Sequence, residues 1–305
     1  MNLLESIGNT PLIRLNNVVP INSAEVWIKY EGNNPTGSYK DRMALGVIKK
    51  AMARGDLKKG DRICEYTGGS TGTSIAFVSS ILGFKFTAVS SNAFAASKLR
   101  AMQAYGADIV LEESSDGTLN PELFQRMKDR VQKISSQSGS YYFDQFGSAD
   151  IRPSYASIGL EIADEMDGSI DAVCHAVGTA GSLMGTVDGL AQRGITPDIY
   201  ALEPLQSPLL TTGKGGGHLV EGIALGFTPP FLDMSVIKES RAIDQEAGFE
   251  MCRRLSKEEG ILAGGSTGLN VVAALTLAKE LGVGKRIVTL GCDNGIKYLG
   301  GHIFS

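Results

Sequence analysis

The sequence predicts an α/β protein built on mostly parallel sheets, and two observations carry that prediction. Short apolar runs rich in β-branched residues alternate along the chain with longer amphipathic runs. The 38 glycines stand singly or in short clusters between these runs, where tight turns from strand to helix need them. Strand–helix alternation of this kind is typical of βαβ units, in which helices flank a parallel sheet.

The elements follow in order along the chain. The expected strands are the short apolar runs at 26–30, 62–66, 84–89, 108–111, 172–177, 199–203 and 286–290. The expected helices are the amphipathic runs at 39–53, 71–82, 95–105, 121–135, 158–166, 182–192, 247–259 and 269–281. Ligands of parallel sheets bind at loops after the carboxyl ends of strands, so the glycine-rich turns there are the candidate site.

The chain is expected to form two lobes. A shift in composition near 141–153 marks the point where one set of βα units ends and a second begins. We predict an N-terminal lobe at 35–147 and a C-terminal lobe at 148–305, joined by the segment 13–34. The 305 residues suffice for two compact cores. The glycine-rich stretch 204–230 is expected to be a long loop near a site.

Composition excludes several partners. The net charge is -4 and no basic cluster with interleaved aromatic residues occurs, so neither nucleic acid nor a membrane surface is expected. No apolar stretch approaches the roughly 18 residues of a membrane span, and the N-terminal segment does not resemble a signal peptide. A cytoplasmic location is the expectation. The four cysteines lack C-x-x-C spacing, which favours buried reduced thiols over disulfides or a metal site.

The first motif with chemical content is the segment from Asn34 to Arg42, NPTGSYKDR. Asn-Pro and Thr-Gly form turns, and Ser38 is a candidate helix N-cap. Lys40 then falls in the first turn of a helix, where the helix dipole disfavours a cation and so favours the neutral amine that a Schiff base needs. From this motif alone, a solvated surface lysine remains the alternative.

A second motif follows the expected strand 172–177. Its residues are small or hydroxylic and lead into a helix: Gly178, Thr179, Ala180, Gly181 and Ser182. Backbone N–H groups at a helix N-terminus make an anion site. The motif has neither the lysine of a P-loop nor the spacing of a dinucleotide fingerprint, so a single phosphate monoester is the better candidate. An ordinary tight turn is the alternative.

Two further segments, 68–72 and 264–268, match the G-x-S-x-G pattern of hydrolase nucleophiles. A hydrolase needs a histidine base, and none of the three histidines, His175, His218 and His302, lies in a sequence that suggests a triad. His175 sits within an expected core strand, which favours packing over catalysis. Both segments are therefore interpreted as loops that hydrogen-bond a small polar or anionic ligand.

Together these motifs resemble the cysteine synthase and cystathionine β-synthase family, the fold-type II pyridoxal-phosphate enzymes. The resemblance runs from Ile7–Leu12 to Asp293–Gly295, and the segment around Lys40 is its most specific part. It implies a tryptophan synthase β-like fold of two lobes, bound pyridoxal 5'-phosphate and a homodimer. It also implies an amino acid substrate with a sulfide or thiol co-substrate.

The resemblance assigns roles to individual residues. Lys40 would carry the cofactor as a Schiff base and then act as the catalytic base. Gly178, Thr179, Ala180, Gly181 and Ser182 match the phosphate cup, with Ala180 in place of a usual glycine. Ser266 matches the serine at the pyridine nitrogen. A serine there leaves the ring a weaker electron sink, which favours β-elimination chemistry.

The substrate side matches less closely. The resemblance places Thr67, Gly68, Ser70, Thr71, Gln145 and Gly222 around the substrate, with Ser70 also near the cofactor. The family usually has Thr-Ser-Gly-Asn-Thr-Gly where this chain has TGGSTG, so Gly68 lacks a hydroxyl donor and Ser70 replaces an asparagine. The segment 91–97 also departs from a usual Pro-x-x-Met-Ser pattern. Each lost bond is worth ~1 kcal/mol.

The implied activity is β-replacement on a β-substituted L-alanine, with O-acetylserine and sulfide giving cysteine and acetate. Three alternatives stay open because of the altered substrate loop. They are a β-eliminating cysteine or serine lyase, a cystathionine β-synthase that uses homocysteine, and a non-catalytic homologue that binds pyridoxal phosphate.

Overall fold

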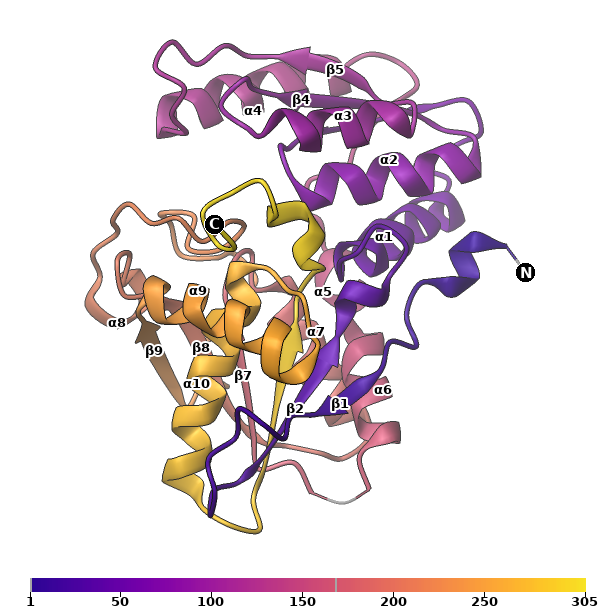
Figure 1. The fold of residues 1–305 in the computed structure, drawn as a ribbon. Coiled ribbons are helices and arrows are strands. Elements are labelled where there is room, and N and C mark those ends of the chain that lie inside the picture. The colour runs from indigo at the N-terminus through magenta and orange to yellow at the C-terminus, as the bar shows by residue number, and fades with distance from the viewer. Residues whose placement is uncertain (1, 168) are drawn as a thin grey trace. The chain divides into compact units, whose positions relative to one another are not determined.

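The computed structural model describes residues 2–167 and 169–305, and its elements fall into two compact units (Figure 1). Unit 1 comprises Met1–Ile7 and Lys40–Ser154, and unit 2 comprises Gly8–Tyr39 and Tyr155–Ser305. The segment 13–34, which was expected to join two lobes, supplies strands to unit 2. The division of the chain into lobes at 35–147 and 148–305 therefore stays a prediction.

Unit 1 is built on a four-stranded parallel sheet with the order β5-β4-β3-β6. Its strands are β3 (Arg62–Tyr66), β4 (Lys85–Ser90), β5 (Asp108–Leu111) and β6 (Ser140–Tyr142). Its helices are η1 (Leu3–Ser6), α1 (Lys40–Arg54), α2 (Ser70–Leu82), α3 (Ala96–Ala104), α4 (Pro121–Ser135) and α5 (Ile151–Ser154). Each of the strands β3 and β4 is followed by a helix, as the alternating pattern predicts.

Helix α4 illustrates how local sequence sets these elements. The Asn120 side chain accepts a hydrogen bond from the Leu123 N–H at 2.9 Å, and Pro121 stands at the first turn, where no N–H is needed. Three apolar residues at helical spacing then face the sheet. The resulting cluster consists of Cys64, Val89, Leu123, Met127 and Val131.

Unit 2 is built on a six-stranded sheet with the order β1-β2-β10-β7-β8-β9, in which β1 alone is antiparallel to its neighbour. Its strands are β1 (Leu12–Arg14), β2 (Glu25–Tyr30), β7 (Ala172–Ala176), β8 (Asp198–Pro204), β9 (Glu239–Ile243) and β10 (Arg286–Gly291). Its helices are η2 (Glu31–Asn33), α6 (Ala156–Glu165), α7 (Gly181–Gln192), α8 (Leu209–Thr212), α9 (Gln245–Arg254), η3 (Leu255–Glu259), α10 (Gly265–Leu281) and η4 (Gly295–Tyr298).

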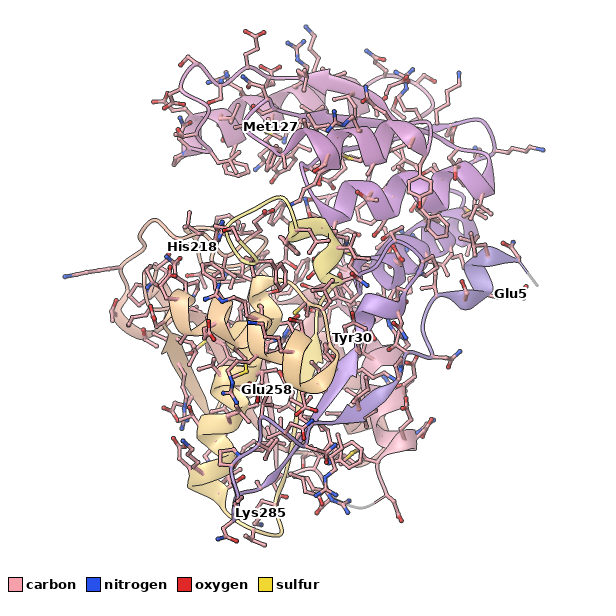
Figure 2. All side chains as sticks on the ribbon, in the orientation of Figure 1. Glu5, Tyr30, Met127, His218, Glu258 and Lys285 are labelled. Carbon is pink, nitrogen blue, oxygen red and sulfur yellow. The ribbon has the colours of Figure 1, made fainter. Side chains whose placement is uncertain are left out.

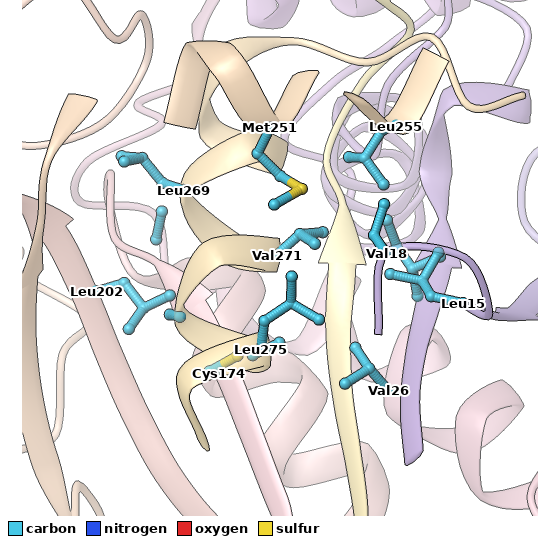
Figure 3. Close-up of a cluster of buried hydrophobic side chains, with 14 of the residues drawn as sticks. Leu15, Val18, Val26, Cys174, Leu202, Met251, Leu255, Leu269, Val271 and Leu275 are labelled. Atoms are coloured by element: carbon cyan, nitrogen blue, oxygen red, sulfur yellow. The ribbon is translucent and has the colours of Figure 1, made fainter. Parts of the chain in front are cut away.

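One hydrophobic core of unit 2 lies between its sheet and helices α9 and α10 (Figure 3). Val26, Cys174 and Leu202 come from three different strands of the sheet. Met251 and Leu275 come from the two helices that cover them. This packing fixes the first turn of α10 beside the ends of the central strands, because α10 contacts β7, β8 and β10 along its length.

Helices α6 and α7 pack closely against each other through glycines. A Cβ atom at Gly159 would overlap the Thr186 carbonyl oxygen, and one at Gly189 would overlap the Ala156 carbonyl oxygen. Neither position therefore accepts a side chain without separating the helices. The close contact sets the position of α7, whose N-terminus carries the second motif.

The expected α/β fold with mostly parallel sheets is confirmed. Strands β1, β6 and β9 and the short helices α5 and α8 were not expected. The expected helix 247–259 was wrong in part, because α9 ends at Arg254 and a π-helical turn follows to Glu259. All four cysteines are buried and free. Within residues 2–167 and 169–305, no helix has the length and apolar character that a membrane crossing requires.

Candidate functional site

The substrate-loop motif of unit 1 lies at a helix N-terminus. Strand β3 ends at Tyr66, and α2 begins at Ser70. Ser70 and Thr71 therefore stand in the first helical turn, where N–H groups lack partners within the helix. Thr67 and Thr71 are buried, and Thr67 precedes the turn. The arrangement provides backbone donors and the positive end of a helix dipole for an anionic group.

Gln145 is brought to this helix from a loop that follows β6. The Thr71 hydroxyl donates to Gln145 Oε1 at 2.9 Å, and Gln145 Nε2 donates to the Tyr66 carbonyl at 3.2 Å. Two residues that the sequence resemblance assigned to the substrate, Thr71 and Gln145, are thus in direct contact. Their chain separation of 74 residues means that only the parallel pairing of β3 with β6 aligns them.

Glu65 holds this arrangement together and was missed in the sequence. Its side chain is fully buried, and it accepts hydrogen bonds from the Gln145 N–H and the Tyr66 N–H, both at 2.9 Å. Burial raises the pKa of Glu65 to about 8 because desolvation disfavours the carboxylate, and the backbone hydrogen bonds offset this only in part. An acidic residue inside the apolar strand 62–66 was the signal available.

Gly68 has a packing reason for lacking a side chain. A Cβ atom there would overlap the ring of Phe94, which lies in the loop after β4. The two departures from the family pattern, at Gly68 and in the segment 91–97, are therefore coupled: the aromatic ring occupies the space of the usual serine.

Lys40 is the first residue of α1, as the motif predicts. The residues before it are held in unit 2. Ser38 forms a β-bridge with Asp293, and the Tyr39 N–H donates to the Cys292 carbonyl at 3.2 Å. The chain passes from unit 2 to unit 1 at the peptide bond between Tyr39 and Lys40.

The second motif forms a tight loop in unit 2 between β7 and α7. Ala180 has a φ of 66°, the left-handed region that favours glycine, at the position where the family usually has one. The Gly181 N–H donates to Thr179 Oγ1 at 3.3 Å. A Cβ atom at Gly178 would overlap the Gly222 carbonyl oxygen, so Gly178 and Gly222 are in contact. Both were expected at the site.

Ser182 ends this loop and contacts a buried histidine. His175 Nε2 lies 2.9 Å from Ser182 Oγ, and Asn270 Nδ2 lies 3.1 Å from His175 Nδ1. His175 was expected to be packed in a core strand, and it is 1% exposed within β7. Its hydrogen bonds to the loop were not expected.

Ser266 occupies the first turn of α10, whose N-terminus lies at the carboxyl end of β10. The Cys292 N–H donates to Thr267 Oγ1 at 2.9 Å, which ties this turn to the residue after the strand. Since β10 and β7 are parallel neighbours, Ser266 and Ser182 stand at the same edge of the sheet. Among the described residues, no hydrogen bond joins Ser266 to the loop 178–182.

The histidines do not form a hydrolase triad. The ring nitrogens of His175 contact Ser182 and Asn270. Those of His218, labelled in Figure 2, contact the Ala224 carbonyl at 3.1 Å and the Val220 N–H at 3.2 Å. His302 packs edge-on against Phe249. None of these contacts sets up a base for either G-x-S-x-G serine, so the hydrolase interpretation has no support.

Comparison with known proteins gives consistent results. The family model described as pyridoxal-phosphate dependent enzyme matches residues 3–293. A cysteine synthase of Staphylococcus aureus (strain Mu50) is 37% identical, over 100% of this chain and 97% of that protein. The crystal structure of an O-ureido-L-serine synthase covers 99% of this chain and 94% of its own, with a TM-score of 0.89 and 32% identity. That of O-acetyl serine sulfhydrylase isoform 3 from Entamoeba histolytica covers 99% and 91%, with a TM-score of 0.92 and 29% identity.

Proposed function

Because the chain belongs to the family of pyridoxal-phosphate dependent enzymes, we propose that it catalyses β-replacement on a β-substituted L-alanine. The substrates are O-acetylserine and sulfide, and the products are cysteine and acetate. The observation that carries the proposal is the likeness to a cysteine synthase over the full length of both chains, at 37% identity. The enzyme then serves cysteine biosynthesis.

The residues of unit 2 fit the phosphate of the cofactor. The loop 178–182 leads into the N-terminus of a twelve-residue helix, α7, and Ala180 accepts a left-handed conformation there. A side chain at Gly178 has no room. Small residues, the N–H groups at the start of α7 and the hydroxyls of Thr179 and Ser182 suit a phosphate monoester. Ser266, at the same sheet edge, would donate to or accept from the pyridine nitrogen.

Lys40 has two tasks in this proposal. Its amine would hold the cofactor covalently, and once free it would take the proton from the substrate α-carbon. Bound pyridoxal phosphate supplies an electron sink for the charge that develops at that carbon. Ser38 and Tyr39, which precede Lys40, are held within unit 2 by the bridge to Asp293 and the hydrogen bond to the Cys292 carbonyl.

The first turn of α2 would hold the substrate carboxylate. The N–H groups of Ser70 and Thr71 and the hydroxyl of Thr67 would donate to it, whereas the hydroxyl of Thr71 already donates to Gln145. Gln145 orients the Thr71 side chain through its 2.9 Å hydrogen bond. Gly68 offers only its backbone, and Gly222 would line the entrance on the side of the phosphate loop.

The Gly68–Phe94 contact favours a second candidate, a β-eliminating cysteine or serine lyase. Loss of a hydroxyl donor and the presence of an aromatic ring alter the side of the site where the leaving group and nucleophile meet. Cystathionine β-synthase activity with homocysteine, and a non-catalytic cofactor-binding role, are the remaining outcomes of the test below. A cytoplasmic homodimer is part of the same proposal and rests on the family resemblance.

The test is product analysis by mass spectrometry with the purified, cofactor-loaded protein. O-acetylserine, serine and cysteine are each mixed with sulfide, homocysteine or buffer alone. Cysteine formed from O-acetylserine and sulfide supports the proposal. Pyruvate and ammonia as the main products indicate the lyase, and cystathionine indicates the synthase that uses homocysteine. Bound cofactor without any product would overturn the enzymatic proposal. Sedimentation velocity tests the dimer.

A further inference from the structure

His175 lies beside the phosphate loop without a role in the chemistry described above. It comes from the middle of the sheet of unit 2, on β7, and is 1% exposed. Its neighbour Asn270 has an amide whose orientation is set by two backbone groups. Asn270 Oδ1 accepts from the Ala176 N–H at 2.7 Å, and Asn270 Nδ2 donates to the Leu290 carbonyl at 2.8 Å.

The orientation of Asn270 determines where the histidine carries its proton. Asn270 Nδ2 lies 3.1 Å from His175 Nδ1, and an amide nitrogen can only donate. His175 Nδ1 is therefore the acceptor and carries no hydrogen, so the neutral ring carries its hydrogen on Nε2. That atom lies 2.9 Å from Ser182 Oγ, which means that His175 donates to the serine.

A serine oxygen that accepts from His175 still has its own hydrogen to donate. The Tyr39 hydroxyl is a second hydrogen-bonding neighbour of Ser182, and the Tyr39 ring packs edge-on against His175 with centroids 6.0 Å apart. Burial raises the pKa of Tyr39 well above its ordinary value, so the phenol keeps its proton.

We propose that His175 is a positioning residue that fixes the Ser182 hydroxyl as a hydrogen-bond donor to the phosphate of the cofactor. An unrestrained serine hydroxyl rotates, and it loses that rotational freedom when it donates to an anion. The chain Asn270–His175–Ser182 limits that freedom, because the Ser182 oxygen already accepts from His175 and its own hydrogen must point away from that bond. The inference rests on the proposed role of the loop 178–182 as the phosphate site.

The test measures cofactor affinity rather than turnover. Apoprotein is titrated with pyridoxal phosphate, and the dissociation constant is read from the absorbance of the lysine adduct. We expect His175→Leu and Ser182→Ala each to raise the dissociation constant about tenfold, and the double variant to raise it by no more than either alone. His175→Gln, whose amide nitrogen reaches the place of Nε2, should remain within about threefold of the wild type.

Two results would overturn the inference. One is a double variant whose loss equals the product of the two single losses, since independent residues multiply. The other is a ¹⁵N spectrum of histidine-labelled protein that places the hydrogen of His175 on Nδ1. The spectrum needs no variant, so a misfolded His175→Leu protein leaves the inference testable. Failure of the wild type to form a borohydride-reducible adduct at Lys40 would instead refute the proposed function, and the inference with it.

Discussion

At the scale of single residues, Lys40 carries the proposed chemistry from the first position of α1. We expect Lys40→Ala to fold but to lose covalent cofactor, and its turnover to fall on the order of 10²–10⁴-fold, the usual contribution of a positioned acid or base. Borohydride reduction followed by peptide mass spectrometry measures the adduct. Lys49→Ala, an exposed lysine of the same helix, is the control and should keep both properties. A reduced cofactor adduct in the Lys40→Ala protein would contradict the assignment.

Glu65 makes the stability of the protein depend on pH. Its pKa is about 8 in the folded protein, above the ordinary value of 4.5, so the folded state retains a proton that the unfolded state has lost between these pH values. The contribution of Glu65 to stability is fully present below pH 4.5 and is lost as pH rises toward 8. The slope is at most about 1.4 kcal/mol per pH unit.

Urea unfolding of the wild type and of Glu65→Gln between pH 5 and 8 isolates this contribution. The free energy of unfolding of the wild type, relative to the variant, should decrease across the range, because the glutamine does not ionise. Glu122→Gln, at an exposed position of α4, serves as the comparison. A flat difference for Glu65→Gln would mean that the buried carboxylate is ionised throughout.

At the scale of elements, the loops after β3 and β4 form one packed unit through Gly68 and Phe94. Gly68→Ser should lower the free energy of unfolding by about 1–3 kcal/mol, because the new side chain overlaps the ring. The double variant Gly68→Ser/Phe94→Ala relieves the overlap. Gly68→Ser should therefore lower the free energy of unfolding less in the Phe94→Ala background than in the wild type. The KM for O-acetylserine should also fall about fivefold relative to Phe94→Ala, since a hydroxyl donor is regained. If Gly68→Ser lowers the free energy of unfolding equally in both backgrounds, the two loops are independent.

The loops that begin at Gly178 and Gly222 are a second such pair. Gly178→Ala places a methyl group against the Gly222 carbonyl oxygen, and backbone on both sides prevents easy relief. We expect cofactor affinity to fall about tenfold or more, measured by titration of the apoprotein. Gly215→Ala is the matched control, because a Cβ atom there meets nothing within 4 Å. A similar cofactor affinity for Gly178→Ala and Gly215→Ala would show that the contact with the Gly222 carbonyl oxygen does not affect cofactor binding.

The elements also differ in how far the sequence predicts them. The strand 62–66 and the helix 121–135 have the expected bounds, because the apolar centre of the strand at Ile63 and Cys64 and the Asn120 cap of the helix are local signals. Strands β1 and β6 have three residues each and exist only through pairing with β2 and β3. Glu65 and Phe94 could not be assigned roles from sequence for the same reason. Their partners lie far along the chain, and only the fold brings them together.

At the scale of the whole molecule, β10 lies between β2 and β7 and joins the two halves of the sheet of unit 2. Trp27, the single tryptophan, pairs with Val288 across β2 and β10 and so reports this junction. Val288→Asp buries an unpaired charge at a site that is 0% exposed, which costs on the order of 3–5 kcal/mol. We expect the Trp27 emission to shift toward that of the urea-unfolded chain.

Val283→Asp introduces the same change at a position that is 74% exposed and just precedes β10. Its Trp27 emission and urea midpoint should match the wild type. If the spectrum of Val288→Asp is also unchanged, the β2–β10 pairing is not needed for the folded environment of Trp27.

The place of β10 in the sheet also determines when the sheet of unit 2 can form during translation. Strand β2 is translated long before its parallel partner β10. At about 5–20 residues per second the interval lasts tens of seconds. All four strands of unit 1 are complete well before its end. Until then β1 and β2 have only each other, and a lone two-stranded hairpin is marginal in water. The apolar side chains of Val26 and Ile28, which are buried in the folded protein, therefore stay uncovered until β10 is made.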